Sequence, residues 1–114
     1  MVSISPIAVK KDDTNYVKIV KNVQSADATG GVTIWTPRSG KKFVITDIIA
    51  STDTGLNLTF KDGADTITVV YLAANSTFVS NFQTPIQSTT EGNSLTVTAS
   101  GSGNISITVT GYEV

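Results

Sequence analysis

The residues of this sequence that could carry out chemistry are carboxylates, because its 114 residues include no histidine and no cysteine. Histidine is the commonest general base and a frequent metal ligand, and cysteine supplies nucleophiles, thiolate ligands and disulfides. Two carboxylates that flank a scissile bond can instead hydrolyse a glycoside. The loop acids that could do so are Asp53, Asp62, Asp65 and Glu91.

The setting of these acids favours turns over catalysis. Asp53, Asp62 and Asp65 each lie in a short segment with Gly or Ala, where Asp is common because its side chain hydrogen-bonds the nearby backbone. Asp62 and Asp65 could form half of a calcium site, but the remaining ligands of a calcium loop are missing. We therefore predict no enzyme activity, no bound metal, no cofactor and no small-molecule substrate.

Two further features involve charged residues near apolar ones. Asp47 lies inside an apolar segment, so it needs exposure at an edge or a basic partner such as Arg38 or Lys42. Trp35 is followed by Arg38, Lys41 and Lys42, and such a group more often packs at the edge of a β-sandwich. A carbohydrate or a neighbouring subunit could also be bound there.

The basic residues gather in the first part of the chain. All eight Lys and Arg lie within residues 1–61, whereas residues 62–114 carry four acids and no base. Copies could attract one another if these parts formed different faces, but interleaved parts would cancel the asymmetry. The net charge of −1 and the absence of a phosphate-binding motif argue against nucleic acid as a partner. No signal peptide and no apolar run of the ~20 residues that span a membrane are present, so we expect a soluble, unprocessed protein.

Alternation of apolar and polar residues predicts eight strands in one all-β domain. Short connectors rich in turn-forming residues favour antiparallel neighbours, and longer connectors before Val32 and between Phe82 and Ser94 suit a Greek key. No stretch has the apolar period of a helix, so we predict a jelly-roll β-sandwich. The predicted strands are residues 16–24, 32–36, 42–51, 56–61, 66–72, 77–82, 94–100 and 104–112.

The same alternation predicts the core and an arm. Residues 42–51 are apolar on both sides, which predicts cover by the second sheet on one face and by an arm or another subunit on the other. Pro6 interrupts the apolar residues near the N-terminus, so residues 1–14 are expected to form an extended arm and residues 15–114 the sandwich. The predicted core residues are Phe43, Ile45, Leu58, Phe60, Val69, Phe78, Leu95, Val97, Ile107 and Val109.

Three segments carry a resemblance to a known group: KKFVITDIIASTDTGLNLTFKDG (41–63), YLAANSTFVSNF (71–82) and EGNSLTVTASGSGNISITVTGYEV (91–114). In their order the chain resembles small single jelly-roll proteins of tailed bacteriophage virions, over roughly residues 40–114. Members of that group decorate heads or form β-sandwich domains of fibres and tails. The pattern includes a turn before an aromatic strand and a final hairpin that closes in Gly-Tyr.

The resemblance implies a head decoration, or cement, protein, a late product made in the host cytoplasm that binds the major capsid protein on the outer surface of the capsid. It also implies a homotrimer. We expect the arm to attach through Val2, Ile4, Ile7, Val9, Lys10 and Lys11. The alternative is a receptor- or glycan-binding domain of a tail fibre, with contacts from Trp35, Arg38, Tyr71 or Tyr112.

Overall fold

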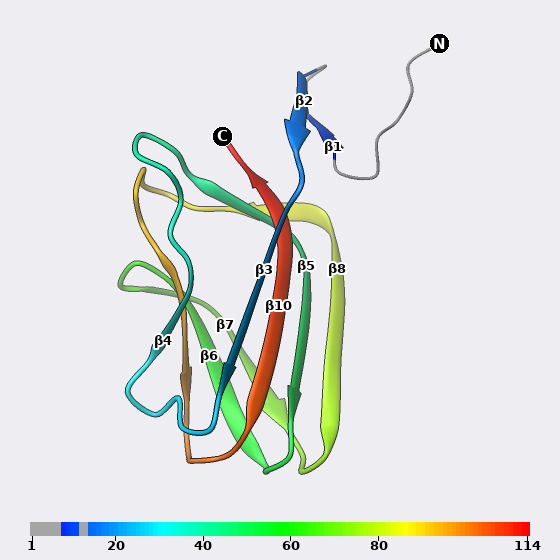
Figure 1. The fold of residues 1–114 in the computed structure, drawn as a ribbon, viewed down its shortest axis with the longest axis vertical. Coiled ribbons are helices and arrows are strands. Elements are labelled where there is room, and N and C mark those ends of the chain that lie inside the picture. Colours follow the sequence, from blue (N-terminus) through cyan, green and yellow to red (C-terminus); the bar gives the residue numbers. More distant parts are fainter. Residues whose placement is uncertain (1–7, 12–13) are drawn as a thin grey trace.

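Two four-stranded antiparallel sheets face each other across an apolar interior (Figure 1). The computed structural model describes residues 8–11 and 14–114, and these residues form strands and no helix. The strands are β1 (Ala8–Lys11), β2 (Thr14–Val17), β3 (Ile19–Ser25), β4 (Val32–Trp35), β5 (Phe43–Thr52), β6 (Leu56–Asp62), β7 (Asp65–Leu72), β8 (Ser76–Gln87), β9 (Leu95–Ala99) and β10 (Ile105–Glu113).

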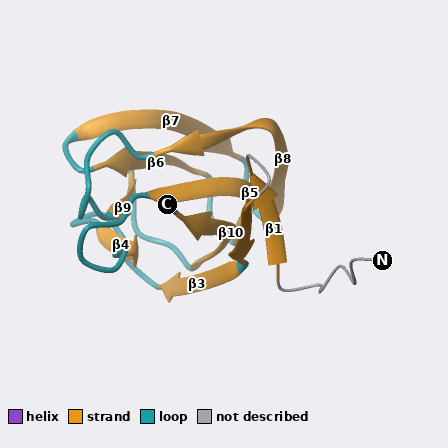
Figure 2. Ribbon diagram, turned by 90° about the horizontal axis from the view of Figure 1, so that it is seen from above, coloured by secondary structure: helices purple, strands orange, loops and turns teal. Residues whose placement is uncertain are grey.

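The order of the strands defines a jelly roll. One sheet has the order β3-β10-β5-β8 and the other β4-β9-β6-β7, so the chain crosses between the sheets several times. These crossings make the two Greek keys of a jelly roll, which confirms the predicted fold class. Figure 2 shows the two layers from the end that carries β1 and β2, which pair only with each other.

Each predicted segment contains a strand, with two differences in extent. The first segment is divided at Lys18 into β2 and β3. The strand predicted to end at Phe82 continues as β8 to Gln87, through Pro85. Proline is accepted there because β8 is an edge strand whose pairing with β5 shifts register between Ile45 and Asp47.

The interior is filled by the side chains that alternate inward from both sheets. Eight of the ten predicted core residues are buried, and Phe78 is half-buried. The prediction that Val69 belongs to the core is wrong, because Val69 is 38% exposed and Val70 is buried in its place. The cause is a register shift beside Phe60, which leaves Val70 opposite the buried Leu58.

A second irregularity explains the apolar residues on both sides of β5. Its pairing with β10 shifts register at Gly111, and its pairing with β8 shifts at the same level. The extra residue reverses the alternation, so Phe43, Ile45 and Ile48 all reach the interior. On the outer face Ile49 is 46% exposed within the chain, so the described residues do not cover it, and cover by another subunit stays a prediction.

Phe60 is fully buried at the centre of this interior. Replacing Phe60 by Ala should lower the free energy of unfolding by about 3–5 kcal/mol, because the cavity cannot be refilled by its neighbours. Val69→Ala, on the outer side of β7, should cost less than about 1 kcal/mol. Denaturant unfolding of both variants checks this, and equal losses would contradict the assignment of the two faces.

Candidate functional site

The N-terminal ribbon, made of β1 and β2, leaves the sandwich beyond Lys18 (Figure 1). Its strands pair antiparallel, with Val9 opposite Tyr16 and Lys11 opposite Thr14. Of the predicted attachment residues, Val9, Lys10 and Lys11 belong to β1. Val2, Ile4 and Ile7 lie outside the described residues.

The ribbon is fixed to the sandwich through an aromatic pair. The rings of Tyr16 on β2 and Tyr112 on β10 are stacked, with centroids 5.1 Å apart and planes 18° from parallel. Stacked aromatic pairs contribute about 0.5–1.5 kcal/mol beyond the area they bury. The base of the ribbon is therefore held against β10, the central strand that pairs with both β3 and β5.

A carboxylate joins the two sheets at this end of the molecule. Glu113 on β10 accepts a hydrogen bond from Trp35 Nε1 at 3.0 Å and a charged one from Arg38 Nε at 2.9 Å. Burial by itself would raise the pKa of Glu113, but the hydrogen bonds from Trp35 and Arg38 outweigh it and hold this pKa below its usual range. The Glu113 side chain is buried, whereas that of Arg38 is 77% exposed, so the cation faces solvent.

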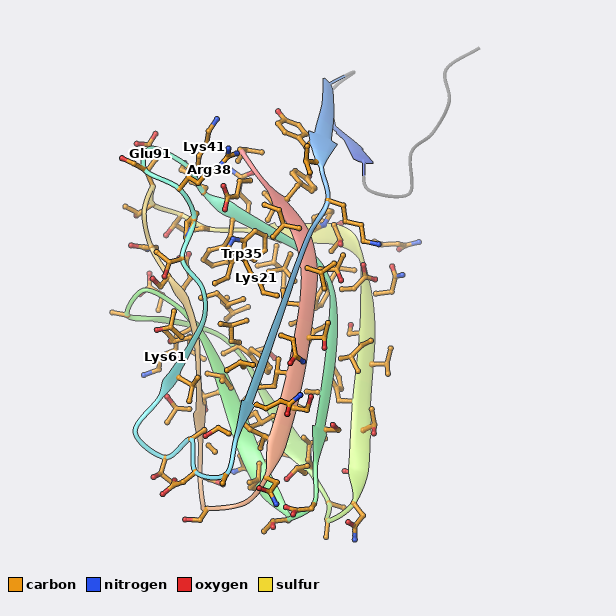
Figure 3. All side chains as sticks on the ribbon, in the orientation of Figure 1. Lys21, Trp35, Arg38, Lys41, Lys61 and Glu91 are labelled. Atoms are coloured by element: carbon orange, nitrogen blue, oxygen red, sulfur yellow. The ribbon has the colours of Figure 1, made fainter. Side chains whose placement is uncertain are left out.

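A pocket of about 370 Å³ lies beside the base of the ribbon. Its lining combines aromatic and apolar groups from Tyr16, Val17 and Ile19 with the cations of Arg38 and Lys41 and with Glu113, whose carboxylate is paired with Arg38. Figure 3 shows Arg38 and Lys41 at the same end of the sandwich as the ribbon, and Lys61 away from them. We call this region, with the ribbon, the arm end. Its chemistry suits an acidic partner segment that also carries an apolar side chain.

The neighbouring loop is held by Asp62, at the end of β6. Its carboxylate accepts hydrogen bonds from Ser88 Oγ at 2.7 Å, from the backbone and side chain of Thr89, and from Asn93 Nδ2 at 3.1 Å. Burial alone would raise the pKa of Asp62, and these donors lower it overall. The role of Asp62 is therefore to fix the loop before β9, as a turn residue would.

The opposite end, the loop end, carries the turns at residues 53–55, 73–75 and 100–104. Asp53 accepts bonds there from the Asn104 side chain at 2.7 Å, from Thr54 and from the Asn104 backbone, and these hydrogen bonds lower the pKa of Asp53. An open groove of about 630 Å³ runs across the outer face of the sheet at this end. Its floor is a row of four polar side chains from neighbouring strands: Gln24, Ser106, Ser51 and Thr77.

The predicted contact residues are only partly brought together. Trp35 and Arg38 meet through Glu113, but Trp35 and Tyr112 are almost completely buried, which leaves neither ring a face for a glycan. Tyr71 is 75% exposed on β7, in the other sheet from Tyr112.

Of the two basic partners predicted for Asp47, Arg38 is wrong, and Asp47 is half-exposed on β5. Arg38 pairs with Glu113, while the Asp47 carboxylate accepts a hydrogen bond from Thr46 Oγ1 at 2.9 Å. Nothing in the sequence near Glu113 or Tyr16 marks them as members of the arm end, since their partners lie far away along the chain.

Two kinds of site are not found within the described part of the chain. Residues 8–11 and 14–114 contain no group of three or more acidic, His or Cys side chains placed to hold a metal ion. No helix among them is long and apolar enough to cross a membrane.

Comparisons with known proteins find similarity of structure and not of sequence. No protein-family model matches the sequence, and no curated protein is similar to it. A protein of Bacillus endospore appendages, described as a novel family of disulfide-linked pili, is similar in structure over 98% of this chain and 97% of that one, with 14% identity and a TM-score of 0.50. A chain of the virus-like particle of the giant freshwater prawn (Macrobrachium rosenbergii) extra small virus matches over 99% of this chain and 86% of that one, with 13% identity and a TM-score of 0.41.

At 14% identity the likeness to the appendage protein shows the fold alone. The resemblance to phage decoration proteins is not confirmed by these comparisons and stays a prediction. The disulfide chemistry in the description of the appendage pili has no counterpart in a chain without cysteine.

The lowered pKa of Glu113 predicts a dependence of stability on pH. The ionised form of Glu113 favours folding. Its contribution to the free energy of unfolding is complete above pH 4.5, the ordinary pKa of a glutamate side chain, and it disappears as the pH falls through the lower pKa that Glu113 has in the folded protein. Glu113→Gln should melt at a lower temperature at neutral pH and should lose less stability than the wild type on acidification.

Melting curves recorded between neutral and acidic pH check this prediction. Glu91→Gln is the matched control, because it removes the same charge from an exposed loop position and should follow the wild type. A Glu113→Gln variant that parallels the wild type at every pH would show that the Glu113 charge does not stabilise the fold.

Proposed function

We propose that this protein is a structural subunit of a virion that decorates the outside of a bacteriophage head. It binds the major capsid protein at the arm end and bridges neighbouring capsid subunits. The observation that carries the proposal is the N-terminal ribbon, which stands outside both sheets beside a pocket lined by aromatic and apolar groups, by Arg38 and Lys41 and by the Arg38-paired Glu113.

The body of the protein suits a mechanical role. Its interior is filled by fully buried side chains, and the acids with lowered pKa values hold loops and strands in place. A general acid needs a pKa raised toward the working pH, which is the opposite of what Asp53, Asp62 and Glu113 have. We therefore assign function to surfaces and not to catalysis.

The arm end offers the ingredients of an attachment surface. Arg38 and Lys41 line its pocket, and Lys10 and Lys11 are placed on β1 close along the chain to Tyr16. An acidic capsid surface would be attracted to these cations, and apolar anchors of the arm would add buried area. A small domain that bridges several subunits stabilises the assembled state by mass action, because it binds the assembly and not the separated subunits.

We further propose, from the resemblance, that three copies associate and present three arms to a three-fold position of the lattice. The alternative function is glycan binding by a tail-fibre domain. The observation that favours it is the polar groove at the loop end, whose row of hydroxyl and amide groups could bind a sugar. A glycan array with the purified protein separates this alternative from attachment to heads.

Deleting residues 1–14 tests the attachment. Tyr16 and its stacking on Tyr112 are retained, so the truncated protein should fold and should melt near the wild-type temperature. It should no longer bind heads that lack the protein, since the predicted anchors are gone. Binding is measured by co-sedimentation with such heads, and wild-type affinity of the truncated protein would refute attachment by the arm.

Charge reversal provides a second, milder test. The double variant Lys10→Glu/Lys11→Glu should weaken binding to heads, and added salt should weaken the remaining binding less than it weakens that of the wild type, because the screened attraction is gone. Lys61→Glu is the control for charge reversal elsewhere, because Lys61 lies on β6, away from Arg38 and Lys41 (Figure 3), and it changes the net charge by half as much as the double variant. A loss of binding in proportion to the change in net charge would point to a general effect of charge and not to the arm end.

A further inference from the structure

The four edge strands of the sandwich are protected to very different degrees. One sheet ends in β3 and β8, the other in β4 and β7. An exposed edge offers unpaired backbone groups to any other strand, and proteins usually block this with short strands, charges or proline. The β3 and β4 edges lie on one flank of the sandwich and the β7 and β8 edges on the other (Figure 2).

The β3 and β4 flank carries two of these protections. β4 has only four residues. β3 follows the exposed Lys18. On the inner side of β3, Lys21 lies between Ile19 and Val23, and these two apolar side chains pack against the core. A strand that added to β3 would have to cover the Lys21 ammonium group, which is costly without a partner charge.

The β7 and β8 flank is almost uncharged. β8 has twelve residues and none of them is charged, and β7 has a single charge, on its first residue Asp65. Three of the exposed large hydrophobic residues lie on these strands: Val69 and Tyr71 on β7 and Val79 on β8. β8 follows β5 residue by residue from Ser76 to Asn81, and Pro85 comes only after the register shift, so a regular, unblocked edge remains over these six residues.

We propose that the β8 edge pairs with the β8 edge of a second copy of this chain, antiparallel about a two-fold axis. The two four-stranded sheets then join into one of eight strands. A two-fold contact places each surface against itself, so a surface whose charges all have the same sign meets only like charges. The β8 edge has no charge to repel, whereas a β3 edge would set Lys18 and Lys21 against their own copies.

The exposed side chains of β8 fit this arrangement. With the axis at Val79, the two Val79 side chains lie directly opposite on the outer face, where each is now 68% exposed, and Thr77 lies opposite Asn81 of the second copy. On the inner side, the half-buried Phe78 lies opposite Ser80, so the contact covers the rest of its ring. The pairing is independent of the proposed function, and it differs from the three-fold association proposed there.

Cysteine cross-linking tests the geometry directly, because the chain has no cysteine of its own. Directly opposite residues of antiparallel strands have Cα atoms about 4.5–5.5 Å apart, within the reach of a disulfide. Val79→Cys should form a disulfide-linked dimer on mild oxidation. Val20→Cys, also exposed and on the outer face of the β3 edge of the same sheet, should form no disulfide-linked dimer under the same conditions.

Sedimentation equilibrium tests the energetics. The wild type should dimerise, and Val79→Lys should raise the dimer Kd about tenfold or more, since two lysines would face each other across the axis. Val20→Lys adds the same charge at a similarly exposed valine and should leave the Kd unchanged. Melting curves establish that both variants are folded.

Three outcomes would overturn the proposal: a wild type that stays monomeric at the highest concentrations, equal weakening by both lysine variants, or a trimer in which Val79→Cys does not cross-link. Loss of head binding after deletion of residues 1–14 bears only on the proposed function. The two ideas can therefore fail separately.

Discussion

The position of β10 at the centre of its sheet is the constraint on which the rest of the structure depends. This strand pairs with β3 on one side and β5 on the other, and its Ile107 and Val109 are fully buried. At Gly111 a side chain would collide with the Val44 carbonyl oxygen, so only glycine allows the close approach of β5 at the bulge. The last residues of the strand then place Tyr112 against Tyr16 and Glu113 against Trp35.

The hydrogen bond from Trp35 to Glu113 connects β10 to β4, a strand of the second sheet. Trp35 ends β4, and its ring lies 5.8 Å from that of Phe43 on β5. Without an acceptor its buried N–H group would cost about 1–3 kcal/mol. Glu113 supplies the acceptor and at the same time holds Arg38 at the surface, so the packing of the interior determines where a cation of the arm end lies.

The jelly roll could be predicted from the sequence because each strand contributes its own alternating pattern. Leu95, Val97, Ile107 and Val109 are buried for that local reason alone. The alternation predicts the wrong face for Val69, because a one-residue bulge reverses every side chain beyond it and no local pattern marks a bulge. The sequence does not predict the continuation of β8 through Pro85, because proline usually ends a strand, except at an edge.

The candidate site could be predicted less well, because it depends on contacts between distant parts of the chain. The pairing of Arg38 with Glu113, 75 residues later, leaves no trace in the composition of either segment. By contrast, the sequence-based interpretation of Asp53 as a turn residue agrees with its bonds to Thr54 and Asn104. Short-range hydrogen bonds follow from local residue types, whereas interactions between sheets require the fold.

The two proposed contact surfaces occupy different parts of the molecule for a structural reason. The ribbon leaves from an end of the strands, where β10 stops, while β8 runs along the length of one flank (Figure 1). Backbone pairing at a flank extends a sheet sideways, and a contact at an end leaves that edge free. A lattice partner and a second copy could therefore bind the same subunit at once, without competing for backbone groups or for the cations of the arm end.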